Sequence, residues 1–177
     1  MTTSIHIQTP HEFWDDVVVP DYDDFLGKID DLRLALHCAI SLFHMADWVY
    51  VTHKAMIDAA FTFKDKTGIP RSVSDEKEFA NALGDAHRNF ELIRQIANTA
   101  KHLKLKRVSS HPNAPSHAAN TAVQGTGWGQ GGFGQGPFGG APRVMLANHP
   151  GQADFEFSDI AESVFKMWQG LRIQHGW

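Results

Sequence analysis

Three polar residues in the middle of the chain recur at every fourth position: Arg94, Asn98 and His102. On a helix this spacing places the three side chains along one face. Arginine binds phosphate groups, asparagine positions oxygen atoms through hydrogen bonds, and histidine transfers protons near neutral pH. We therefore take Arg94 as a candidate phosphate contact, Asn98 as a positioning group and His102 as a proton-transfer group of a catalytic site. A solvated helix face, or a set of polar core groups that bond to one another, would give the same pattern.

A second polar row lies on an otherwise apolar stretch and contains His37, His44 and Asp47. A carboxylate beside a histidine fixes its tautomer and raises its basicity, which is the requirement for a general base. We predict that these residues orient the groups of the catalytic row or form a partner site for that row. A neutral histidine bonded within the core is the alternative. His102 with this row would supply metal ligands, but compact ligand pairs are lacking, so no metal and no cofactor is predicted.

The sequence has one basic cluster, which adjoins the first polar row. It consists of Lys101, Lys104, Lys106 and Arg107. Cations that hold phosphates beside a proton-transferring histidine are the expected arrangement for a site that cuts RNA. These four residues are therefore candidate RNA-binding residues. The negative end of a helix would favour the same charges without any ligand.

The composition limits the classes of function. The chain has 177 residues, which suits one domain, and a net charge of -4 leaves no broad basic field for coating DNA. A lone cysteine, Cys38, forms no intramolecular disulfide and is expected in the core. The N-terminus lacks a leader pattern and no apolar run approaches the roughly 20 residues of a membrane span. We expect a cytoplasmic protein without membrane contact, and no phosphate-binding loop or nucleophile elbow is present.

Apolar residues at steps of three and four predict helices over Asp30–Tyr50 and over Asp75–Leu105, the second capped by Ser72 or Ser74. A bend is expected near 49–52, followed by more helix over Met56–Phe63 until the stop at 67–70. Residues 11–24 are expected to form a short helix or an extended lead-in.

The second half of the chain changes character. Glycine-rich composition predicts a flexible insert over 109–142. Segments 143–147 and 154–157 flank a turn composition and predict a small β-hairpin, and a last helix capped by Ser158 or Asp159 is expected to run through Leu171. The prediction is thus an all-α single domain over 1–177, a four- to five-helix bundle with a minor C-terminal β-hairpin and the insert.

At His44-Met-Ala-Asp47-Trp48 and Arg94-Gln-Ile-Ala-Asn98-Thr-Ala-Lys101-His102 the chain resembles uncharacterised small helical proteins from bacteria and phages. The resemblance covers most of the chain outside the glycine-rich segment. Such proteins are similar to the HEPN superfamily, helical bundles that often dimerise and whose active members cleave RNA without a metal. Their usual motif separates the arginine and histidine by four to six residues, and here seven intervene. The resemblance implies a homodimeric RNA-cleaving toxin or phage-defence factor, with Arg94, Asn98 and His102 as site residues.

Two other functions fit the same residues. In the first, the polar rows are a hydrogen-bonded core network, and the protein is a non-catalytic interaction module that recruits an unknown partner through a helix face or the glycine-rich segment. In the second, His37, His44, Asp47 and His102 belong to a metal-dependent enzyme. The packing of 44–47 against 94–102 is the observation that separates these readings.

Overall fold

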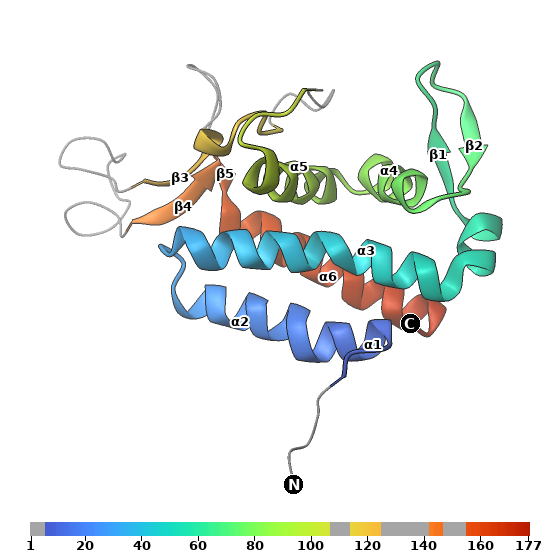
Figure 1. The fold of residues 1–177 in the computed structure, drawn as a ribbon, viewed down its shortest axis with the longest axis horizontal. Helices are drawn as coiled ribbons and strands as arrows, with labels where there is room; N and C mark the ends of the chain where they lie inside the picture. The colour runs from blue at the N-terminus through green and yellow to red at the C-terminus, as the bar shows by residue number, and fades with distance from the viewer. Residues whose placement is uncertain (1–5, 107–113, 125–141, 147–154) are drawn as a thin grey trace, which may run out of the picture.

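The computed structural model describes residues 6–106, 114–124, 142–146 and 155–177. Over these residues the protein is mainly α-helical, with two small antiparallel sheets (Figure 1). The helices are α1 (Pro10–Phe13), the π-helix η1 (Trp14–Val18), α2 (Val19–Gly27), α3 (Leu32–Ala60), α4 (Glu76–Ala86), α5 (Arg88–His102), the 3-10 helix η2 (Ala118–Asn120) and α6 (Phe157–His175). The strands are β1 (Thr62–Lys64), β2 (Pro70–Ser72), β3 (Thr121–Gln124), β4 (Arg143–Leu146) and β5 (Phe155–Glu156).

The long helix α3 is the centre of the molecule. It contacts α2 on one side, α4 and α5 on the other, and α6 behind (Figure 1). The Asp31 side chain caps it by accepting hydrogen bonds from the backbone N–H groups of Arg33 and Leu34. Fully buried Trp168 of α6 donates from Nε1 to the Leu42 carbonyl at 2.9 Å, which joins the two helices inside the core.

The bend expected in this helix occurs at His53, whose backbone angles (φ -117°, ψ 26°) are not helical. By length and composition alone α3 is also apolar enough to cross a membrane, although no membrane span was predicted from the sequence. However, 56% of that apolar stretch is buried inside the molecule, as in the core helix of a soluble protein. The composition of α3 therefore assigns no location.

The single helix predicted over Asp75–Leu105 is wrong, because the chain breaks it at His87 into α4 and α5. His87 is extended (φ -135°, ψ 101°). A Cβ on Gly84 would come within 3.1 Å of Glu91, so the glycine allows the two helices to approach closely. Leu83 and Phe90 stay buried on both sides of the break. The apolar periodicity of the sequence continues across the break, so it predicted one helix where there are two.

The helix predicted over Met56–Phe63 ends early, at Ala60, and a β1–β2 hairpin follows. The Asp65 carboxylate organises its turn by accepting from the backbone N–H groups of Thr67 and Ile69 and from the Arg71 side chain. These donors, with the Thr67 hydroxyl first among them, hold the pKa of Asp65 far below its usual value. The cap of α4 is Asp75 in place of the predicted Ser72 or Ser74.

The predicted C-terminal hairpin is confirmed as β4 paired with β5, and a third strand extends it. That strand, β3, lies within the segment 109–142 predicted as a flexible insert, and the glycine-rich residues 125–141 lie outside the described part of the chain. The last helix begins at Phe157 with Glu156 as its N-cap residue, so the cap lies two or three residues before the predicted Ser158 or Asp159.

Candidate active site

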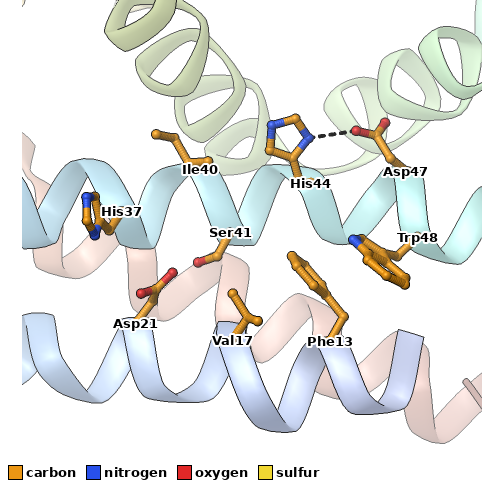
Figure 2. Close-up of a pocket in the computed structure, with 9 residues that line it drawn as sticks. All are labelled: Phe13, Val17, Asp21, His37, Ile40, Ser41, His44, Asp47 and Trp48. Atoms are coloured by element: carbon orange, nitrogen blue, oxygen red, sulfur yellow. Dashed lines mark hydrogen bonds and ion pairs between the residues drawn. The ribbon is translucent and has the colours of Figure 1, made fainter. Parts of the chain in front are cut away.

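An open cavity of about 550 Å³ runs between α3 and the α1–α2 segment. Figure 2 shows its two ends: Asp21 and His37 lie at one, and Phe13 and Trp48 at the other. Val17, Ile40 and Ser41 line the space between them. Its volume falls within the range of small-molecule pockets in proteins.

His44 and Asp47 stand at the rim of this cavity, one turn apart on α3. His44 Nδ1 lies 2.7 Å from Asp47 Oδ2, and the two side chains are 50% and 43% exposed. Because an ionised carboxylate only accepts hydrogen bonds, the proton of the neutral imidazole sits on Nδ1. The other nitrogen, Nε2, then carries a lone pair and points away from Asp47 (Figure 2). This is the arrangement of an oriented general base.

A second cavity, of about 460 Å³, adjoins the first on the side of α5. Ile40 and His44 line both cavities. From α5 the second cavity receives Asn98 and Lys101, together with two alanines whose small side chains leave the space open. The structure therefore brings His44 together with two polar residues of the facing helix, Asn98 of the first polar row and Lys101 of the basic cluster.

Arg94 lies in a different environment. Its guanidinium is 2.6 Å from the Glu91 carboxylate and donates to Asn81 Oδ1 at 2.7 Å. It lines a polar cleft beside the β1–β2 hairpin, together with Lys64 and Asp85. Glu91 is buried and also accepts from Gln95, so the charge of Arg94 is neutralised within the protein. The structure thus separates Arg94 from the cavity that holds Asn98.

His102 and the basic cluster lie at the end of α5. His102 is exposed, and the chain turns at Leu103, which has a positive φ of 53°. Lys104 then forms a β-bridge with His117, and Lys106 is exposed. Arg107 lies outside the described residues. Helical spacing therefore placed His102 in the row, but the structure places it at the exposed last residue of the helix.

Phe13 and Asp21 were not predicted as site residues from the sequence, and Trp48 was given no role of its own. Phe13 and Trp48 stack on one another, with ring centroids 5.0 Å apart and an angle of 14°. Phe13 directly precedes η1, a π-helical turn of the kind often found at functional sites. The lead-in segment had no periodicity strong enough to place either residue, whereas Trp48 follows Asp47 directly and was already part of a quoted motif.

Neither a reactive thiol nor a metal-binding cluster lies near the site in the part of the chain that the structure describes. Cys38 is fully buried, and burial followed by the nearby Asp21 charge raises the pKa of its thiol, which disfavours a reactive thiolate. No group of three or more His, Cys, Asp or Glu side chains among the described residues is arranged to hold a metal ion.

The chain was compared with known protein families, curated proteins and solved structures. No protein-family model, no curated protein and no solved structure matches the chain.

Proposed function

We propose that this protein is a HEPN-like, metal-independent RNA-cleaving protein of the toxin or phage-defence type, with His44 as the proton-transfer residue. The observation that carries the proposal is the His44–Asp47 pair at 2.7 Å, on a wall shared with the cavity that contains Asn98 and Lys101. A base, an amide and an ammonium group around one space are the groups needed to act on a phosphodiester.

The proposed reaction uses the 2′-hydroxyl of RNA as nucleophile. His44 Nε2 removes its proton while O2′ bonds to the adjacent phosphorus and the bond from phosphorus to the 5′-oxygen breaks. The leaving oxygen takes a proton from solvent, so the products are a 2′,3′-cyclic phosphate and a 5′-hydroxyl. Asp47 accepts from Nδ1–H and stabilises the imidazolium, while Asn98 and Lys101 face the phosphate oxygens.

The geometry favours His44 over His102 for this role. His44 has an orienting carboxylate and lies in two cavities, whereas His102 is an exposed residue at a helix end. A core network, as in the interaction module, would bury His44, and its side chain is half exposed. Arg94 has no part in the proposed reaction, because its ion pair with the buried Glu91 fits a structural role.

The test is incubation of the purified chain with single-stranded RNA in the presence of EDTA. The variant His44→Gln keeps the size of the side chain but removes the base, and we expect its cleavage rate to fall about 10²- to 10⁴-fold. His102→Ala is the matched control and should cleave like the wild type.

Three results would decide against the proposal. Equal cleavage by wild type and His44→Gln removes the role of His44, and no cleavage by the wild type leaves the interaction module. If His102→Ala alone loses activity, the catalytic histidine is the one at the end of α5.

We further propose that the helices form a four- to five-helix bundle that carries the insert 109–142 and acts as a cytoplasmic homodimer. Light scattering on the purified chain measures its mass directly. A mass of one chain, 19.7 kDa, would contradict the dimer.

A further inference from the structure

We propose that the cavity shown in Figure 2 is a base-binding site that selects RNA bases carrying an exocyclic amine over uracil, next to the bond that is cut. The inference rests on the proposed function for the identity of the polymer. The cavity itself is defined by its own residues and is tested without cleavage.

The aromatic end of the cavity provides a surface for stacking. Phe13 and Trp48 form a parallel pair there, and both are only partly buried. Stacking of a base on an aromatic side chain accepts any base, because every base has a π-face. This end therefore supplies binding without selection.

The opposite end provides the selection. The Asp21 carboxylate lines the cavity, and no hydrogen-bond or ion-pair partner for it is found among the described residues. A carboxylate accepts a hydrogen bond from the exocyclic amine of cytosine, adenine or guanine, whereas uracil presents a carbonyl where cytosine carries its amine. Asp21 therefore favours amine-bearing bases over uracil.

The charges of the two cavities give the nucleotide one orientation. The cavity of Figure 2 is lined by Asp21 and Asp47 and by neither lysine nor arginine, so it disfavours phosphate. The adjoining cavity contains Lys101 and Asn98 and no carboxylate. His44 lines both. A base held near Asp21 and Trp48 thus directs its phosphate across His44 toward α5, where the proposed reaction requires it.

The experiment uses short 2′-O-methyl RNA strands of uniform sequence, which lack the nucleophilic hydroxyl and stay intact. We expect oligo-C and oligo-A to bind the wild-type chain about tenfold more tightly than oligo-U, measured by fluorescence anisotropy. Asp21→Asn should reduce that preference to about one. Asp23→Asn, an exposed change of the same charge on the same helix, should retain it.

Stacking is tested at Trp48. Trp48→Ala should weaken binding of all three strands about tenfold, and Trp48→Phe, which keeps an aromatic ring, should retain most of the affinity. The phenylalanine variant also guards against loss of folding in the alanine variant. Tryptophan emission that oligo-C quenches in the wild type and not in Trp48→Phe places the base beside this ring.

Equal binding of oligo-C and oligo-U would overturn the inference, and so would a preference for oligo-C that survives Asp21→Asn. Quenching of Trp48 emission by tetramethylammonium and not by oligo-C would also overturn it, because the cavity would then be a site for organic cations. The two proposals fail separately. Selective binding through Asp21 without any RNA cleavage overturns the proposed function alone. Cleavage that requires His44 but shows no base preference overturns the base-binding site alone.

Discussion

On α3 and again on α5, a basic side chain is paired with a carboxylate three residues away on the same helix. On α3, His44 lies 2.7 Å from Asp47, and on α5, Arg94 lies 2.6 Å from Glu91. The first pair is 50% and 43% exposed, and the second is 20% and 10% exposed. Asn81 also fixes Arg94, whereas His44 keeps a nitrogen directed away from its partner. Similar spacing therefore gives a site open to a ligand in one place and an internal support in the other.

Replacing Glu91 tests the buried pair and should have the largest effect on stability. Glu91→Ala leaves the guanidinium of Arg94 partly buried without its carboxylate, and Arg94 Nε is already buried without a partner among the described residues. We expect the free energy of unfolding to fall by about 3 kcal/mol, measured by urea denaturation. The control is Glu162→Ala, which removes an exposed ion pair with Lys166 and should cost less than about 1 kcal/mol. Equal losses would show that the Arg94 pair is not a structural support.

The substitution Asp47→Asn tests the exposed pair. Its amide cannot stabilise the imidazolium that His44 becomes, so we expect the RNA cleavage rate to fall on the order of 100-fold. Stability should change by less than about 1 kcal/mol, because both side chains are exposed. If Asp47→Asn loses much stability and cleaves RNA at an unchanged rate, Asp47 is a structural residue, as Glu91 is.

Salt dependence sharpens the contrast between Lys101 and Arg94. If Lys101 contacts one phosphate, Lys101→Met should reduce the slope of log affinity against log salt by about 0.7 for single-stranded RNA. Replacing both Glu91 and Arg94 by methionine removes that pair without leaving a charge unpaired, and the slope should stay unchanged. A slope that falls in the double variant would assign Arg94 to RNA contact, as the sequence first predicted.

The smallest expected effect is a pH dependence at the junction of α4 and α5. Burial lowers the pKa of His87 in the folded state, and its Nδ1 is buried without a partner among the described residues. The unfolded chain then binds more protons, so the stabilising contribution is complete above the ordinary histidine pKa of about 6.5 and is lost as pH falls below it.

Thermal unfolding at pH 7.5 and at pH 5.5 measures this effect. We expect His87→Gln to lose less stability between the two pH values than the wild type does. His53, whose pKa is also lowered by burial, remains in both proteins and accounts for part of the residual dependence. Identical pH dependence of the variant and the wild type would show that His87 contributes nothing.

The sequence predicted the elements whose apolar residues recur regularly, and missed those set by local geometry. The helix from Asp30 and the last helix were located because their apolar faces pack against the core, as Leu42 and Trp168 do. The break at His87 was missed because Leu83 and Phe90 face one core on both sides of it. The β1–β2 hairpin was missed because its strands are only three residues long and its turn depends on the Asp65 side chain.

For the candidate site, residue type and spacing in the sequence predicted His44, Asp47 and Asn98. The sequence could not separate Arg94 from Asn98, because one helical row contains both. Nor could it find Asp21 or Phe13, which come from a segment without a clear period. These residues belong to the cavity only because α1 and α2 fold along α3 (Figure 1).

The order of side chains along the chain alone determined where α3 and α6 form and placed His44 and Asp47 within one turn of each other, since helical periodicity and contacts between near neighbours are local properties. Only the tertiary structure decided which polar groups face open space and which are neutralised inside. Burial and the choice of partner depend on residues far apart in sequence: Asn81 beside Arg94, Asn98 and Lys101 in the same cavity as His44, and Asp21 across from α3.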